Sequence, residues 1–528
     1  MKMKINSRRD LLIVGIFLAM FFGALDQTIV GTSLPRIIGE LGGLSVFAWV
    51  TTAYMLTSTT VVPIAGKLAD IYGRRVVYVT GICIFLIGSA LCGLSQTMTQ
   101  LIIFRGIQGI GGGTMMPMAM IIIGDLFPPE KRGKWQGVIG GVFGIASIVG
   151  PTIGGWIVDH STWHWVFYVN LPVGILAATA IFYGLQGEKR LKEKVSIDYV
   201  GTIALVIGVV SLLLGLNMGG KDFPWDSWQI ISLLSTSVIF FAAFIAIERR
   251  VKEPILSLHL FQNRVFTVSN IIGFLMGLGM FGAIMFIPLF LQGVIGISAT
   301  NSGNTIIPMM LAMVTTSIIG GLLISRVRFR SMFLTGMTLM SIGFFLLSTL
   351  SVNSSQSTAI LFTVFLGLGM GFIMQTVTVS VQNAFSAELR GVATSSTQFF
   401  RSIGGTLGTT ILGVVLNNSS IGILNKDFFP KVKSIPALNV GDFGKMISKA
   451  HSDPQSLFNL LLNKDALNKI PKDIQNILLP PLKNALSNSL NTVFFVAGCV
   501  IVLGIITSFF MGNARIIKRT HRSMLEEV

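Results

Sequence analysis

Residues 66–81 read GKLADIYGRRVVYVTG, and residues 321–336 read GLLISRVRFRSMFLTG. The two stretches align at an offset of 255 residues, with glycine at both ends and with Arg75 in register with Arg330. Each stretch joins the end of one apolar run to the start of the next. The pair therefore indicates an internal repeat, which is common in membrane transporters.

A second pair of short motifs repeats at almost the same spacing. Arg132-Gly133 precedes one apolar run and Arg390-Gly391 precedes another, at an offset of 258 residues. Because the two offsets nearly agree, we predict a duplicated unit of six helices.

The apolar runs around these motifs set the number of membrane spans. A helix that crosses a bilayer needs about 20 mostly apolar residues. Fourteen such windows occur, at residues 11–34, 47–66, 75–95, 100–126, 135–157, 165–186, 198–217, 228–247, 265–291, 304–324, 332–351, 358–381, 392–416 and 489–511. We predict an all-α integral membrane protein with an N-terminal six-helix bundle (1–186), a linker with two inserted transmembrane helices (187–264) and a C-terminal six-helix bundle (265–528).

The composition excludes a soluble protein. Of the 528 residues, 52% are hydrophobic and only 12% are charged, whereas soluble domains carry about 25% charged residues. The 58 glycines suit helices that pack closely on one another within a membrane.

The formal net charge of +17 comes from basic residues whose positions indicate the orientation of the spans in the membrane. Most of the 39 lysines and arginines lie in alternate connections between spans, and such an excess marks the cytoplasmic side. Both termini are then cytoplasmic, and we expect no nucleic-acid partner. The predicted location is the cell membrane, as a multi-pass protein of a bacterial plasma membrane.

Tryptophans support the same topology. Six of the seven fall at predicted outer ends of spans, where an interfacial aromatic belt is expected: Trp49, Trp156, Trp163, Trp165, Trp225 and Trp228.

One long polar stretch, about residues 417–488, is an extracellular loop in this topology. Six prolines interrupt its short amphipathic runs. Long loops are often functional or disordered, so two interpretations stay open: a tolerated surface insertion, or a cap over the exit path of a transporter.

Asp26 is the only acid deep inside a predicted span. A charge at that depth costs at least about 2.5–3.5 kcal/mol, so such residues are functional or paired. Counted along the helices, Arg105 lies at a similar depth, and we expect the two to pair and to serve proton coupling. Arg401, midway through another span, is the rival partner. With Gln108 and Gln398, Arg401 is also a candidate to line a cavity.

The turn between the second and third spans is short and charged. It holds Lys67, Asp70, Arg74 and Arg75 between Gly66 and Gly73. An ordinary solvated charge run is one interpretation; the other, which we favour, is a charge latch that joins the two halves in one conformation. The second copy of this turn has lost the acid, because Ser325 aligns with Asp70.

Residues 141–156, GVFGIASIVGPTIGGW, place Ala146, Gly150 and Gly154 on one face of a helix. Small residues every four positions favour close helix contact. Pro151 interrupts this face beside Gly154 and Gly155, and the bent helix is a candidate to seal one side of a pathway.

Motifs for enzyme chemistry are missing from the sequence. The glycines of residues 109–113 resemble a phosphate loop, but the lysine and hydroxyl of that motif are absent, so we interpret them as helix-packing glycines. We expect no enzyme activity, no catalytic residue, no cofactor and no metal site.

In chain order, the motifs LDQTIVGTSLP (25–35), GKLADIYGRR (66–75), FRGIQGIGGG (104–113) and GPTIGG (150–155) make the sequence similar to the fourteen-span drug:proton antiporters of the major facilitator superfamily. The resemblance implies two six-helix bundles around a cavity that opens alternately to either side, and a chain that works as a monomer. It also implies roles for Asp26 in proton coupling, Arg105 in proton transfer or substrate response, Asp70 with Arg74 and Arg75 in gating, and the helix at Gly150 in export direction.

The function predicted from these observations is proton-coupled export of hydrophobic or amphipathic compounds, of the multidrug efflux type. The expected partners are protons, a small hydrophobic or amphipathic substrate and membrane lipid. Further acids that some relatives carry for cationic drugs are absent here, so we do not expect strong selectivity for dications. The alternative is export of a lipid or glycolipid precursor, favoured by the 417–488 loop. A membrane sensor without transport is the third hypothesis.

Overall fold

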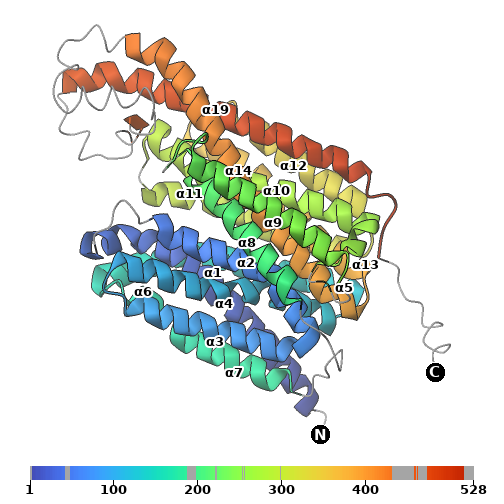
Figure 1. The fold of residues 1–528 in the computed structure, drawn as a ribbon. Coiled ribbons are helices and arrows are strands. Elements are labelled where there is room, and N and C mark those ends of the chain that lie inside the picture. The colour runs from blue at the N-terminus through green and yellow to red at the C-terminus, as the bar shows by residue number, and fades with distance from the viewer. Residues whose placement is uncertain are drawn as a thin grey trace.

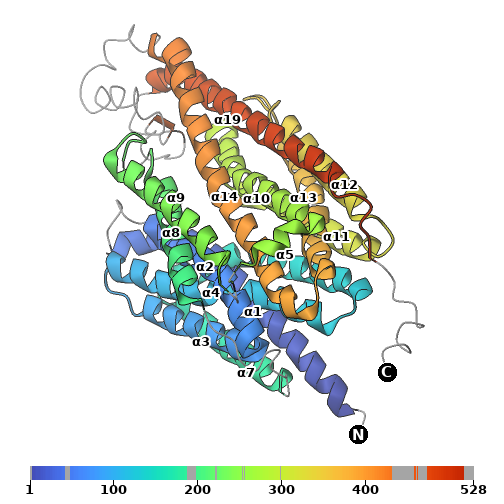
Figure 2. The ribbon, with the colours of Figure 1, turned by 45° about the vertical axis from the view of Figure 1, so that its right-hand side comes forward.

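The structure, a computed structural model, describes residues 3–41, 48–186, 198–220, 223–251, 254, 256–297, 299–430, 457–458, 461 and 472–516. The described part is built from long helices and has no named strand. Its first and last long helices begin and end on the same side of the molecule, as Figures 1 and 2 show. This arrangement fits the predicted topology, in which both termini lie on one side of the membrane.

The N-terminal bundle consists of seven helical segments: α1 (Met3–Leu41), α2 (Ala48–Tyr72), α3 (Arg74–Gly93), α4 (Met98–Leu126), α5 (Pro129–His160), α6 (Trp165–Tyr168) and α7 (Asn170–Gly184). Helix α1 packs against α5 and α7, and α4 packs between α2 and α3. The glycines of 109–113 allow the α4 contacts, since a Cβ on Gly111 would lie 2.3 Å from the Phe85 backbone nitrogen and one on Gly113 2.3 Å from the Ser58 carbonyl oxygen. They pack helices, as the sequence predicted.

The C-terminal bundle repeats this plan with helices α10 (Arg264–Phe290), α11 (Ala299–Leu323), α12 (Phe329–Leu347), α13 (Gln356–Ala384), α14 (Ala387–Ile423) and α19 (Lys472–Phe509). Helix α10 packs against α14, and α13 packs between α11 and α12. A Cβ on Gly277 would lie 2.2 Å from the Arg401 carbonyl oxygen, so α10 touches the backbone of α14 at this point.

Two further helices, α8 (Tyr199–Met218) and α9 (Trp228–Glu248), pack on each other between the bundles in sequence. One apolar cluster joins Leu205 of α8 to Val62 of α2 and Phe399 of α14. The inserted pair therefore contacts both bundles along one side (Figure 2).

Twelve helices in the described residues are long and apolar enough to cross a membrane. They correspond to twelve of the fourteen predicted spans; the other two predictions fall on α2 and α5, which have 25 and 32 residues and are not among the twelve. Both helices contact the opposite bundle. The count of fourteen spans and the domain boundaries at 187 and 265 stay predictions.

Two sequence expectations need correction. Helical residues extend from α14 to Phe428 and resume at Lys472, so the loop predicted at 417–488 is narrower at both ends; most of its centre lies outside the described residues. Trp163 is not part of a lipid-facing belt, because it is buried and its Nε1 donates to Glu40 at 3.0 Å.

Candidate functional site

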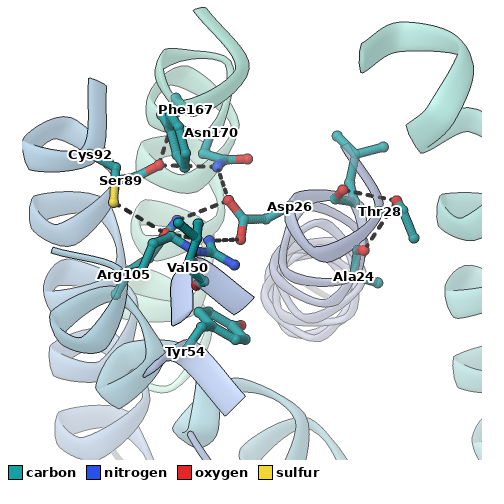
Figure 3. Close-up of polar contacts among 12 residues, drawn as sticks. Ala24, Asp26, Thr28, Val50, Tyr54, Ser89, Cys92, Arg105, Phe167 and Asn170 are labelled. Carbon is teal, nitrogen blue, oxygen red and sulfur yellow. Dashed lines mark hydrogen bonds and ion pairs between the residues drawn. The ribbon is translucent and has the colours of Figure 1, made fainter. Parts of the chain in front are cut away.

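Asp26 lies at the centre of a buried polar network between α1, α4 and α7 (Figure 3). Its Oδ2 pairs with Arg105 Nη1 at 2.6 Å. Its Oδ1 accepts from Gln108 Nε2 at 2.9 Å and from Asn170 Nδ2 at 2.8 Å. All three partners donate N–H groups, so the contacts match an ionised carboxylate, which only accepts. The depth count along the helices had predicted the Asp26–Arg105 pair.

The surroundings of Arg105 hold it in this pair. Its Nη1 also donates to Gln108 Oε1 at 2.6 Å, and its Nε donates to the Val50 carbonyl at 3.4 Å. Its guanidinium carbon lies 4.4 Å above the centre of the Tyr54 ring. Arg105 and Gln108 are three residues apart on α4 and so share one face of that helix.

Asn170 ties the network to a third helix. It begins α7, and its Nδ2 also donates to Ser89 Oγ at 3.0 Å. The Ser89 hydroxyl donates in turn to the Phe167 carbonyl at 2.8 Å. Asp26 is therefore fixed by side chains from α4 and α7, whereas Thr28 points to the opposite side of α1, toward α5 (Figure 3).

A cavity of about 150 Å³ lies beside this network, between the two bundles. Gln27, Tyr54 and Ser58 line it from the N-terminal bundle, and Gln398 and Arg401 line it from α14. Tyr54 touches both the cavity and Arg105, so its ring separates the cavity from the buried ion pair. Gln108, expected in the cavity lining, is instead fully buried in the Asp26 network.

Below the cavity, a cluster of charges joins the bundles on the side predicted to be cytoplasmic. Asp70 pairs with Arg74 at 2.6 Å and accepts from the Val392 backbone nitrogen of α14 at 3.0 Å. Asp125 of α4 pairs with Arg74 at 3.2 Å and with Arg390 of α14 at 2.5 Å. Burial raises the pKa of Asp70 from 3.8 to about 6, although Arg74 and the Val392 nitrogen act against that rise.

The contacts that join the bundles on this side, here called the closure, are related to each other by the internal repeat. Arg132 donates to the Gln382 carbonyl at 3.3 Å, and Arg390, its counterpart, donates to the Gly124 carbonyl at 3.3 Å. Gly124 aligns with Gln382 at the same offset of 258 residues. Each half thus makes the same contact with the other, as two halves related by a two-fold axis must.

Glycine pairs make the closure tight in the same symmetric way. A Cβ on Gly133 would lie 2.3 Å from the Gly321 carbonyl oxygen, and one on Gly66 would lie 3.1 Å from the Gly391 carbonyl oxygen. Gly66 aligns with Gly321 and Gly133 with Gly391. The bundles therefore meet backbone to backbone at Gly133 and Gly321. At the equivalent place, a Cβ on Gly66 would first meet the Ser395 side chain, and one on Gly391 would meet the Asp70 carboxyl group.

A family model described as Major Facilitator Superfamily matches residues 16–409. The chain belongs to the major facilitator superfamily. It is similar to the multidrug transporter protein MdtP of Bacillus subtilis, at 51% identity over 96% of this chain and 93% of the relative. It is also similar to multidrug resistance protein 3 of the same organism, at 41% identity over 96% and 95%.

Solved structures agree on the major facilitator fold. The human transporter MFSD10 superposes with a TM-score of 0.62 at 13% identity, over 95% of this chain and 99% of that one. The proton:xylose symporter XylE superposes with a TM-score of 0.59 at 12% identity, over 95% of both chains. At such low identity these likenesses show the fold alone. The family match and the Bacillus relatives make this chain a multi-pass efflux transporter of the cell membrane.

Gly73, Arg75 and Gly150, three of the remaining motif residues of this major facilitator protein, lie at helix junctions or contacts. Gly73 has a φ of 90° between α2 and α3, a conformation that favours glycine, and Arg75 lies over the Phe182 ring at 3.8 Å. A Cβ on Gly150 would meet the Thr28 hydroxyl of α1, while nothing lies within 4 Å of one on Gly155. Helix α5 continues through Pro151 to His160, with Gly154 buried in it, and Lys67 lies in the last turns of α2.

The sequence did not single out four residues that complete these sites. Tyr54, Asn170, Asp125 and Gln382 each sit within or beside an apolar run. For Asp125 the signal was its place one residue before the end of α4, opposite the inner turn that holds Arg74. For Asn170 no signal marked it, because an amide at a helix start is an ordinary capping residue.

Proposed function

We propose that this major facilitator protein exports hydrophobic and amphipathic compounds in exchange for protons, by alternating access. The observation that carries the proposal is the fully buried Asp26, held by Arg105, Gln108 and Asn170 and divided from the cavity by one aromatic ring. A buried ionisable group inside a membrane protein is a candidate proton carrier. The two Bacillus relatives are named for multidrug transport and multidrug resistance, which supports the substrate class.

The exchange of substrate for protons follows from the protonation and deprotonation of Asp26. When Asp26 takes a proton, its ion pair with Arg105 loses its Coulomb attraction, and the three donors that match the carboxylate no longer all find an acceptor. When the proton leaves, the pair forms again. Because Tyr54 touches both Arg105 and the cavity, a change at the pair moves the cavity wall.

The symmetric contacts between the bundles provide the moving element. They close the cytoplasmic side through Arg132 and Arg390 and through the two glycine pairs. In this conformation the bundles are joined on the side predicted to be cytoplasmic. Export requires a second conformation in which these contacts break and the outer ends approach each other.

The alternative, export of a lipid or glycolipid precursor, rested on the 417–488 loop and on an apolar cavity poor in acidic residues. The centre of that loop lies outside the described residues, and no comparison favours this substrate. It stays a prediction from the sequence.

Efflux of ethidium and of the neutral dye Nile red from energised bacterial cells tests the proposal. Cells that carry the wild-type protein should export a dye, and a protonophore should stop the export. Asp26→Asn, at equal amounts in the membrane, should export neither dye. Export that continues in the mutant, or that ignores the protonophore, would show that Asp26 does not couple the two movements.

A further inference from the structure

Arg401 is a buried cation that the coupling network does not use. Its exposed fraction is 8%, and it lies midway through a predicted span. Asp26, the acid that it was a candidate to pair with, is occupied by Arg105. Within the described residues Arg401 has no carboxylate partner. A buried charge without a counter-ion is costly, so its retention inside a membrane points to a role in the transport path.

The contacts of Arg401 leave most of its hydrogen-bonding groups for something else. Its Nη2 donates to Gln398 Oε1 and lies 3.9 Å from Met116 Sδ. A guanidinium carries five N–H groups, and the contacts to described residues use only those on Nη2. The backbone beside it is fixed, because α10 packs against the Arg401 carbonyl at Gly277. The guanidinium is thus held in place with donors to spare.

The cavity around Arg401 matches an amphipathic occupant. Arg401 and Gln398 line both the main cavity and a small pocket of about 10 Å³ next to it, which adds the hydroxyls of Thr378, Thr394 and Thr397. The rest of the main lining is largely apolar and includes flexible methionines, which adapt to different shapes: Met55, Met116, Met280, Met313 and Met374. The lining contains no aspartate or glutamate.

We propose that this cavity recognises organic anions, compounds with an apolar body and an acidic group such as a carboxylate, through Arg401. The acidic group accepts from the free guanidinium donors, and the apolar body lies against the methionines. Amphipathic cations are disfavoured, because the lining offers them a positive charge and no acid. This inference rests on the proposed export function and names the substrate class of the same cavity.

The test compares two ligands that differ only in charge, dansylphenylalanine and its neutral amide. Both are fluorescent, and the acid is an anion at neutral pH. Binding is measured with the full-length protein in nanodiscs of zwitterionic lipid, with empty nanodiscs subtracted. We expect the wild type to bind the acid at least tenfold more tightly than the amide. Equal binding, or preference for the amide, would overturn the proposal without any variant.

Variants assign the preference to Arg401. The ratio of the two Kd values should fall to near one in Arg401→Gln and should be kept in part in Arg401→Lys. Arg330→Gln, on a guanidinium that lies over Phe509 instead, is the matched control and should keep the full ratio. A ratio that survives in Arg401→Gln would rule out this residue as the anion site.

Two further measurements distinguish this proposal from binding of a lipid headgroup and from failure of the export function. Replacing part of the nanodisc lipid by an anionic phospholipid should raise the Kd for the acid less than twofold; a large rise would assign the site to a lipid headgroup and overturn the assignment to dissolved compounds. Efflux of Nile red from cells tests the export function by itself. Export of Nile red without binding of the acid would overturn the anion proposal alone, and absence of all export would overturn the proposed function.

Discussion

At the scale of the residue, the central feature is a pair of opposite charges inside the membrane. Asp26 and Arg105 are each exposed by no more than 1%, and each is the counter-ion of the other. Such a pair contributes little net stability, but removing one partner leaves the other charge buried alone. The cost of keeping the pair is understandable if the pair must break and form again in each transport cycle.

A double-mutant comparison tests this coupling. Asp26→Asn leaves Arg105 without a counter-ion and should destabilise the protein by about 3–5 kcal/mol. Asp26→Asn combined with Arg105→Gln should recover most of that loss, since both charges are then gone. Thermal unfolding in one detergent measures both. Equal destabilisation by the single and the double variants would mean that the two charges are not energetically linked.

Asp70 predicts a pH dependence of the cytoplasmic closure. Its buried environment raises its pKa from 3.8 to about 6, so the closed conformation binds a proton more tightly than an open one that hydrates the carboxylate. Closure is then most favourable below about pH 4 and weakens as the pH rises through 6. The charged groups that face Asp70 are Arg74 and, one step further, Asp125.

Distances between spin labels on the exposed cytoplasmic residues Lys131 and Arg326 report this closure. The population with the short distance should increase when the pH is lowered from 7.5 to 5.5. In Asp70→Asn, which carries no charge at either pH, the change should disappear. An opposite shift in the wild type would mean that the ionised carboxylate is the form that closes the gate.

At the scale of the element, helices meet where side chains are absent. Helix α5 touches α11 at Gly133 and Gly321, and α2 touches α14 at Gly66 and Gly391. At Gly133 and Gly321 backbone faces backbone, so no side chain can move to admit a methyl group, whereas at Gly66 and Gly391 the nearest groups are the Ser395 and Asp70 side chains. These contacts lie on the side predicted to be cytoplasmic and belong to one conformation.

Gly133→Ala should therefore shift the equilibrium away from the closed cytoplasmic side. Its Cβ would lie 2.3 Å from a carbonyl oxygen, far inside a normal contact. The same spin labels should show a longer mean distance, and efflux should fall. Gly413→Ala on α14 is the matched control, because nothing lies within 4 Å of that Cβ. Similar distances in both alanine variants would contradict the proposed role of the glycine contact.

Sequence reasoning worked best where helices are long and straight. A constant rise of about 1.5 Å per residue converts position into depth, and this placed Asp26 opposite Arg105. The repeat offsets paired Arg132 with Arg390, and the structure shows that these two residues make equivalent contacts between the bundles. Asn170 and Gln382 were missed because neutral amides carry no charge cost that would mark them.

At the scale of the whole molecule, the two bundles form a cytoplasmic closure below one cavity, with one buried carboxylate beside it. If each cycle moves one proton inward at Asp26, the charge moved depends on the substrate. A neutral compound moves one charge, an exported monoanion moves two and an exported monocation moves none. Each charge contributes about 2.3 kcal/mol per 100 mV of membrane potential.

Transport currents distinguish these cases. Purified protein in liposomes, with the potential set by a potassium gradient and valinomycin, should respond twice as strongly to the potential with dansylphenylalanine as with its amide. A monocationic dye should give no steady current. Equal currents for all three substrates would mean that the proton number changes with the substrate or that the protein does not exchange protons.

The most direct test of the whole account is uphill transport of Nile red or of dansylphenylalanine amide by purified protein in liposomes under an imposed pH gradient. The wild type should accumulate substrate against its gradient. Asp26→Asn should still exchange labelled for unlabelled substrate across the membrane at equal pH, because its cavity is intact, but should build no gradient. Accumulation by Asp26→Asn at half the wild-type rate or more would show that this carboxylate does not carry the proton that drives export.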